Sequence, residues 1–152
     1  MKNSQEIYSG RHCVFNLKVH LVFLPKYRRK VFTVKIFDFL KNVFISICHD
    51  FECTLEEFNG EEDHIHLLIS YPPKVQLSKL VNSLKGVSSR LLRKQNLPEI
   101  KSKFWGKHFW SPSYYAGSCG GVTIEHIKKY IDSQKSPNSY LKTPLVSLLD
   151  IS

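Results

Sequence analysis

The chain has 152 residues, 42% of them hydrophobic, which is the size of one compact domain with a single core. Lys and Arg number 22 against 13 Asp and Glu, so the net charge of +9 favours a polyanionic partner, nucleic acid ahead of a membrane surface. No segment reaches the roughly 20 apolar residues of a membrane span, and the first residues lack an apolar signal region, so we expect a cytoplasmic protein without a membrane partner.

The first half of the chain predicts a strand, a helix and a hairpin. Residues 13–24 alternate between apolar and polar side chains, as a strand does. Apolar residues at helical spacing predict a helix over residues 33–49. Residues 52–58 and 64–70 predict two further strands, and Asn59-Gly60 indicates the turn between them because both residues tolerate positive φ.

The second half of the chain predicts two more helices and one more strand. Leucines and valines at helical spacing mark a helix over residues 77–92. A strand over about residues 110–118 ends at Gly120-Gly121, and Thr123 is expected to cap a last helix. The expected inward residues of that helix are Ile124, Ile127 and Ile131.

This order of elements predicts an α+β fold. The pattern βαββαβ suits a four-stranded antiparallel sheet with two helices on one face, the ferredoxin-like or RRM-like arrangement. The other face of the sheet is then free for a ligand or for the additional last helix, which carries Tyr130. We expect residues 1–152 to form a single domain, with its core at about 13–136 and a tail, 137–152, that shows no interpretable pattern.

The sharpest local feature is the run Asp63-His64-Ile65-His66 at the start of a predicted strand. Side chains two residues apart in a strand emerge on the same face, so His64 and His66 are able to chelate one metal ion together. The alternative is that both imidazoles lie on a solvated strand face, and a lone His-x-His motif does not decide between the two.

A second pair of candidates lies on the last helix. Tyr130 and Gln134 are spaced i, i+4, which places them on one helix face about 6 Å apart along the axis. Taken alone, the pair also fits a half-buried tyrosine and an exposed glutamine near a helix end.

Basic residues interleave with aromatic residues in several places, a combination used to bind single-stranded nucleic acid. Cations neutralise phosphates, and flat rings stack on unpaired bases. Single aromatic rings are more often core residues, and basic residues beside a helix stripe are often only a solvated face. The candidate DNA contacts are Lys26, Tyr27, Arg28, Arg29, Lys30, Lys85, Arg90 and Lys107.

Together these motifs resemble a known family, the single-tyrosine HUH transposases of minimal bacterial insertion sequences that move as single-stranded DNA. That family carries a His-hydrophobe-His motif on a strand and a tyrosine followed four residues later by glutamine on a late helix, as in His64-Ile65-His66 with Tyr130 and Gln134. The resemblance extends in order and spacing from about residue 13 to residue 134, and includes the stretches 19–30, 84–92 and 104–121.

The resemblance implies a transposase that cleaves and rejoins single-stranded DNA through a 5′-phosphotyrosine intermediate. Tyr130 would be the nucleophile, and His64, His66 and Gln134 would hold one Mg²⁺ or Mn²⁺ ion. The implied partners are DNA hairpins at the ends of a mobile element and a second copy of the chain, with active sites shared between subunits as one arrangement. Gly120-Gly121 would then let the tyrosine helix move, and the alternative is that the two glycines form only the turn before that helix.

Two other interpretations stay open at this point. A non-catalytic domain that binds single-stranded nucleic acid on the same fold leaves the coincidence of the His, Tyr and Gln residues unexplained. A domesticated HUH endonuclease that acts on repeats shares the chemistry and differs only in its flanking DNA.

Overall fold

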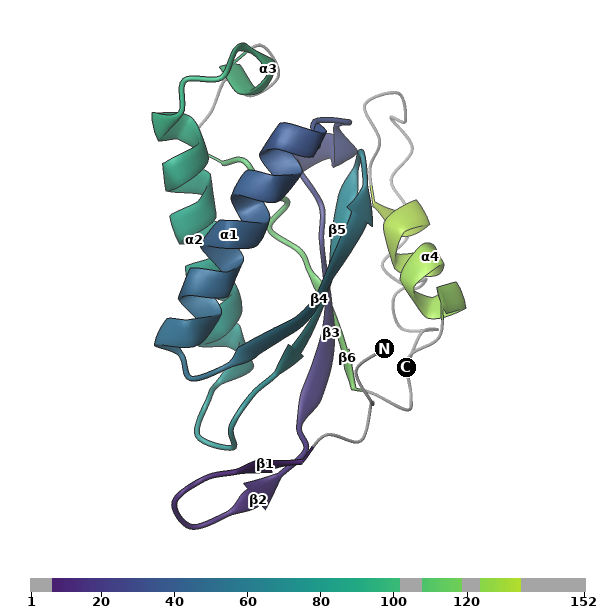
Figure 1. Cartoon of the computed structure of the whole chain (residues 1–152). Helices are drawn as coiled ribbons and strands as arrows, with labels where there is room; N and C mark the ends of the chain where they lie inside the picture. Colours follow the sequence, from purple (N-terminus) through teal and green to yellow (C-terminus); the bar gives the residue numbers. More distant parts are fainter. Residues whose placement is uncertain (1–6, 102–107, 119–123, 135–152) are drawn as a thin grey trace.

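Four antiparallel strands form the central sheet in the order β4-β5-β3-β6 (Figure 1). The computed structural model describes residues 7–101, 108–118 and 124–134. The strands are β3 (Lys18–Phe23), β4 (Thr54–Glu61), β5 (His64–Ser70) and β6 (Tyr115–Ser118). With α1 (Val34–Asp50) after β3 and α2 (Leu77–Lys94) after β5, the chain follows the order βαββαβ, which confirms the α+β, ferredoxin-like prediction.

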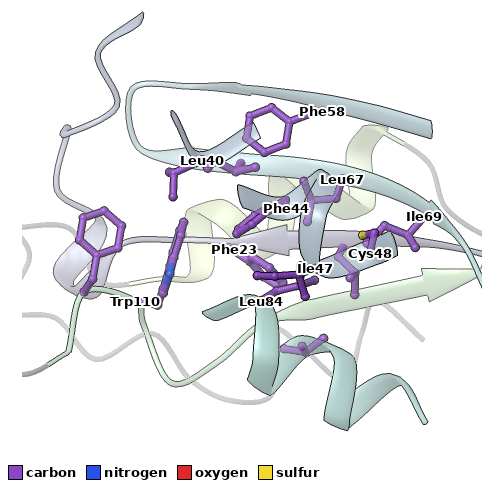
Figure 2. Packing of buried hydrophobic residues seen from close by; sticks show 14 of the residues in the cluster. Phe23, Leu40, Phe44, Ile47, Cys48, Phe58, Leu67, Ile69, Leu84 and Trp110 are labelled. Carbon is purple, nitrogen blue, oxygen red and sulfur yellow. The ribbon is translucent and has the colours of Figure 1, made fainter. Parts of the chain in front are cut away.

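Helices α1 and α2 cover one face of the sheet and enclose the main core. Three aromatic residues meet in this core (Figure 2). The ring of Phe23 lies edge-on to those of Phe44 and Trp110, with centroid distances of 6.0 and 5.8 Å. The indole N–H of Trp110 donates to the hydroxyl of Ser88 on α2 (2.9 Å), so the buried ring also satisfies its polar atom.

Both core helices follow from local signals in the sequence. Thr33 caps α1, because its hydroxyl accepts a hydrogen bond from the backbone N–H of Ile36 (3.3 Å). Helix α2 is strongly amphipathic and buries one stripe of side chains against the sheet and α1. That stripe consists of Leu80, Val81, Leu84, Ser88, Ser89 and Leu92.

Helix α4 (Ile124–Ser133) packs on the opposite face of the sheet from α1 and α2 (Figure 1). A small second core forms there from Val22 and Leu24 at the end of β3 and Tyr130 and Ile131 of α4. Ile127 packs against this cluster. Both faces of β3 are therefore covered near its C-terminal end, and the sheet lies between two helical layers.

The hairpin turn lies at Glu62 and Asp63, so the prediction of a turn at Asn59-Gly60 is wrong. Asn59 and Gly60 belong to β4 and pair with His66 and Ile65 of β5. Tertiary contacts fix the observed turn, because the carbonyl of Glu62 accepts hydrogen bonds from the backbone of residues 31 and 32. Gly60 serves a close approach instead, since a Cβ there would lie 2.3 Å from the carbonyl oxygen of His64.

Two predicted strands are shorter than expected. The strand predicted over 13–24 is divided, because β2 (Val14–Phe15) leaves the main sheet and pairs with β1 (Tyr8–Ser9). The fourth strand begins only at residue 115, since Pro112 lacks the N–H that a continuous ladder needs. Before it, Trp110 pairs with Pro25 as an isolated bridge. A short helix without a clear signal in the sequence, α3, spans Pro98–Lys101.

Several predictions fall on residues outside the described ranges, namely those for Lys107, Gly120-Gly121, the cap at Thr123 and the tail 137–152. Within the described ranges, no helix combines the length and the apolar character that crossing a membrane would need.

Candidate active site

Strand β5 presents His64 and His66 on the sheet face that α4 covers. Along β5 the histidines are half-buried while Ile65 and Leu67 are fully buried on the α1 and α2 side. His66 lies directly opposite Val22 of β3, and Val22 packs against Tyr130. Directly opposed residues in an antiparallel pair project to the same side, so His66 and Tyr130 share one face of the sheet.

A third histidine joins this pair. Nδ1 of His20 on β3 is hydrogen-bonded to Nε2 of His66 at 2.9 Å, and the two rings stack with centroids 5.1 Å apart. Burial, together with the neighbouring His20 and His64, lowers the pKa of His66 to about 4. Burial also lowers the pKa of His20. His66 is therefore a neutral imidazole at neutral pH, which is the form that binds metals.

Asp63 orients the other histidine of the motif. Nδ1 of His64 donates to Oδ1 of Asp63 at 3.0 Å, which leaves Nε2 of His64 as the atom directed to a ligand. The second oxygen of Asp63 accepts from Nε of Arg28 at 2.8 Å. Although burial favours the neutral acid, the hydrogen bonds from His64 and Arg28 lower the pKa of Asp63 below its ordinary value.

Arg28 also connects the hairpin to α4. Its Nη2 lies 3.7 Å from Oδ1 of Asp132, two residues after Tyr130. The guanidinium thus lies between Asp63, at the start of β5, and the C-terminal half of the tyrosine helix. Asp132 is largely exposed, so this second ion pair contributes little energy, but it shows that the two elements are neighbours.

A group of ligand atoms suited to a divalent cation lies at the same place. Among the described residues, Glu61, Asp63 and His64 offer ligand atoms that all lie within 4.8 Å of one another. A ligand set of carboxylate oxygens and imidazole suits Mg²⁺ or Mn²⁺ better than it suits a structural Zn²⁺ ion. The sequence motif indicates His64, His66 and Gln134 as ligands but neither carboxylate, because Glu61 and Asp63 come close to His64 only through the hairpin turn.

Tyr130 is buried, with 1% of its surface exposed. Its ring packs on Val22, Leu24 and the ring of Tyr115, at a centroid distance of 5.7 Å from the last. Its hydroxyl is hydrogen-bonded to Oγ of Ser113 at 3.0 Å. Burial raises the pKa of Tyr130 to about 12, and the hydrogen bond with Ser113 offsets only part of that effect.

Gln134 follows directly after α4. Its backbone N–H donates to the carbonyl of Ile131 (3.1 Å), and its side-chain Nε2 donates to Oγ of Ser133 (3.2 Å). The amide oxygen is therefore the atom that Gln134 offers to a cation. The hydrogen bonds of the Tyr130 and Gln134 side chains are thus to Ser113 and Ser133. Neither side chain is hydrogen-bonded to His64 or His66 among the described residues.

The candidate DNA contacts divide into two kinds. Residues 26–28 form a short 3₁₀ turn in which Tyr27 adopts a left-handed backbone (φ 64°) and stays 51% exposed. Nζ of Lys26 lies 5.5 Å from the centroid of that ring, and Cζ of Arg29 lies 5.7 Å from it. Lys30 and Arg90 are exposed. Lys26 and Arg29 therefore present cations beside an accessible ring.

Lys85, the remaining described candidate, has intramolecular contacts. Its Nζ donates to the carbonyl oxygens of Ser111 and Ser113, both at 2.8 Å. The same atom lies 5.4 Å from the ring centroid of Phe23 and 5.3 Å from that of Tyr114. Burial lowers the pKa of Lys85 to about 8. The sequence could not reveal this role, because a lysine beside an apolar helix stripe has the same pattern as a solvated one.

Comparisons with known proteins identify the family of this chain. A family model described as "Transposase IS200 like" matches residues 13–134. The chain is 34% identical over 129 residues to the ISDra2 transposase TnpA of Deinococcus radiodurans, covering 85% of this chain and 91% of that protein. It is also 34% identical over 123 residues to a transposase for insertion sequence element IS200 of Salmonella typhimurium, covering 81% and 80%.

Solved structures give the same result. A transposase structure from Deinococcus radiodurans superposes with a TM-score of 0.76 at 30% identity, covering 85% of this chain and 98% of that one. A REP-associated tyrosine transposase bound to a REP hairpin shares the fold alone, with a TM-score of 0.52 at 12% identity over 84% of this chain and 69% of that one.

The fold and the matched residues therefore define an α+β transposase, an enzyme class that cleaves DNA. More particularly, the chain belongs to the IS200-like transposase family.

Proposed function

We propose that this transposase cleaves and rejoins single-stranded DNA at the ends of a mobile element, with Tyr130 as the nucleophile and a divalent cation beside it. The observation that supports this proposal is the common sheet face of His66 and Tyr130, with Arg28 between Asp63 and Asp132. A domain that only binds nucleic acid would not require histidines, a tyrosine and these ion pairs to be grouped on one face.

His64, His66 and Gln134 are the proposed ligands of the cation, and the donor atoms fit this assignment. His64 is oriented by Asp63, His66 is neutral at physiological pH, and the amide oxygen of Gln134 is available. The nearby carboxylates of Glu61 and Asp63 favour a hard ion, Mg²⁺ or Mn²⁺. Such an ion supplies Lewis-acid polarisation of the scissile phosphate.

Tyr130 performs the covalent chemistry in this proposal. Its oxygen attacks the phosphorus and displaces the 3′ oxygen of the preceding nucleotide, which takes up a proton and leaves as a free 3′-OH. The 5′ phosphate is then esterified to Tyr130. A second 3′-OH attacks that ester, restores the phosphodiester and returns the phenol, so one bond forms for each that breaks and ATP is not required.

The buried phenol needs help before it attacks. With a pKa of about 12, only about one Tyr130 in 10⁵ is ionised at neutral pH. Tyr130 must therefore reach a less buried position, gain a neighbouring positive charge, or transfer its proton to a base.

Single-stranded DNA hairpins are the proposed substrate. The exposed ring of Tyr27 with Lys26, Arg29 and Lys30 offers stacking and phosphate contacts. The REP-associated relative named above is bound to a hairpin, which makes a hairpin a sensible first probe. We further propose that the chain is one domain with its core at about 13–136, and that it acts as a homodimer in the cytoplasm.

An adduct assay tests the proposal directly. A labelled single-stranded hairpin is incubated with the protein and Mn²⁺ or Mg²⁺, and the products are separated under denaturing conditions. We expect a covalent protein–DNA adduct with the wild type, none with Tyr130→Phe, and an undiminished adduct with the matched control Tyr71→Phe, which lies against the other core.

The same assay separates the competing interpretations. If wild type and Tyr130→Phe both bind the hairpin and neither forms an adduct with either metal, the chain is a binding domain and the proposed chemistry is wrong. An adduct that persists in Tyr130→Phe would assign the nucleophile to another residue.

A further inference from the structure

The hydroxyl of Tyr130 has a specific partner outside the histidine group. It lies 3.0 Å from Oγ of Ser113, in the segment that leads into β6. A buried phenol without such a partner would lose its hydrogen bond to water without compensation. The contact therefore stabilises one particular position of the Tyr130 ring, packed between Val22, Leu24 and Tyr115.

Ser113 is itself held firmly in place. Lys85 reaches from α2 and donates hydrogen bonds to the carbonyls of Ser111 and Ser113, both at 2.8 Å. Hydrogen bonds from a charged donor are stronger than neutral ones. The backbone N–H of Ser113 also lies 3.4 Å from Oγ of Ser111. The serine hydroxyl is thus presented to Tyr130 by an anchored loop.

Ser113 lies on the opposite side of β3 from the strand that carries the histidines. In the sheet, β3 lies between β5, which carries His64 and His66, and β6. Val22 of β3 pairs with His66 on one side and with Tyr115 on the other. Two strand spacings, roughly 10 Å, therefore separate the histidine strand from the strand that Ser113 precedes.

We infer that Ser113, anchored by Lys85, is a positioning residue that holds Tyr130 in a resting position on the β6 side of the sheet, and that Tyr130 leaves Ser113 before it attacks DNA. This inference rests on the proposed role of Tyr130 as nucleophile. Ser113 would then control the fraction of time in which the Tyr130 phenol can attack DNA. Ser113 itself would not contact the DNA.

The test compares Ser113→Ala with two controls. Ser113→Thr keeps a hydroxyl at the same place, and Ser118→Ala removes an exposed hydroxyl from β6, the strand that Ser113 precedes. Single-turnover adduct formation is measured at saturating hairpin DNA with Mn²⁺. Loss of one hydrogen bond in the resting position should raise the adduct-forming rate of Ser113→Ala about fivefold, while the hairpin affinity stays unchanged. Ser113→Thr and Ser118→Ala should match the wild type.

A second readout needs no DNA. The protein is produced with 3-fluorotyrosine, and the fluorine resonance of Tyr130 is identified as the one missing in Tyr130→Phe. Its shift between H₂O and D₂O reports the exposure of the ring to solvent. We expect a buried ring in the wild type and Ser113→Thr, and a more exposed one in Ser113→Ala. Ser113→Cys, which fills nearly the same space, serves if the alanine variant does not fold, and should give an intermediate shift.

The outcomes are distinct. An unchanged or slower adduct rate in Ser113→Ala, or a Tyr130 resonance that stays as buried as in the wild type, overturns the inference. A wild type that forms no adduct overturns the proposed function instead, and the fluorine measurement then still decides whether Ser113 holds the ring.

Discussion

At the scale of single residues, the two histidines of the His-x-His motif have different hydrogen-bond partners. His64 is oriented by Asp63, while His66 is hydrogen-bonded to His20 on the neighbouring strand. Partners of this kind fix the tautomer and direction of a metal-binding imidazole. Asp63 and His20 thus extend the site beyond the residues that the motif itself suggests.

The contact between Asp63 and His64 leads to a prediction about metal affinity. Asp63→Asn removes the carboxylate that orients His64, and Mn²⁺ affinity should fall roughly tenfold or more. Titration calorimetry of Mn²⁺ into the DNA-free protein measures it. Asp50→Asn, at the exposed end of α1, removes the same charge far from the site and should bind as the wild type does. Equal affinities of the two variants would show that Asp63 does not support the ion.

The burial of Tyr130 predicts a dependence of stability on pH. Its pKa is about 12 in the folded protein against about 10 in an unfolded chain, so between these values only the unfolded state has lost the proton. Ionisation then favours unfolding, and this contribution to stability, complete below pH 10, is lost as the pH rises toward 12. Denaturant unfolding of wild type and Tyr130→Phe should show the wild type losing about 2 kcal/mol more over this range. Parallel losses in both proteins would place the phenol in water.

At the scale of elements, the β4–β5 hairpin positions the site more than any other feature. Its turn brings Glu61 and Asp63 next to His64, and it lets Arg28 reach both Asp63 and α4. The close approach of the two strands at Gly60 is part of this arrangement.

Two glycine substitutions should have opposite effects on stability. In Gly60→Ala the new Cβ meets the carbonyl of His64 at 2.3 Å, which should lower the unfolding free energy by about 2 kcal/mol. Gly86→Ala lies on the exposed side of α2 with nothing within 4 Å, and should raise the unfolding free energy by about 0.5–1 kcal/mol. Thermal and urea unfolding check both values, and a neutral Gly60→Ala would mean that the hairpin adapts easily.

At the scale of the whole molecule, the sheet separates two layers with different tasks. Helices α1 and α2 build the core on one face, whereas α4 brings Tyr130 to the face of the histidines. Helix α4 packs in the small cluster of buried residues around Tyr130, whereas α1 and α2 pack in the main core, which contains most of the buried apolar side chains. Loss of α4 contacts should therefore cost less than loss of the main core, which is compatible with the proposal that Tyr130 leaves Ser113 before it attacks DNA.

A mixing experiment addresses the assembly. Tyr130→Phe lacks the proposed nucleophile, and His64→Ala lacks a proposed metal ligand, so neither subunit alone should form the adduct. Because the hydroxyl of Tyr130 is hydrogen-bonded to Ser113 and not to a histidine of its own chain, we expect a mixture of the two variants to recover cleavage through a site built from two chains. Adduct yield on the hairpin measures this. A mixture as inactive as its components would confine each active site to one subunit.

The sequence by itself determined the order of elements, the ferredoxin-like class and the residues that resemble the family motif. These follow from periodic apolar patterns and from the short range over which a strand or helix fixes neighbouring side chains, as for His64 and His66. The hairpin turn was wrongly predicted, because contacts from residues 31 and 32 to Glu62 outweighed the local preference of Asn59-Gly60.

Only the tertiary structure decided which groups meet. His20 and His66 are 46 residues apart, Lys85 reaches Ser113 from another layer, and Ser113 is hydrogen-bonded to Tyr130. None of these contacts has a local signature, because each depends on strand order and on the face that a helix covers. The residues proposed to carry the chemistry could therefore be named from the sequence, whereas the residues in contact with them became visible only once the chain was folded.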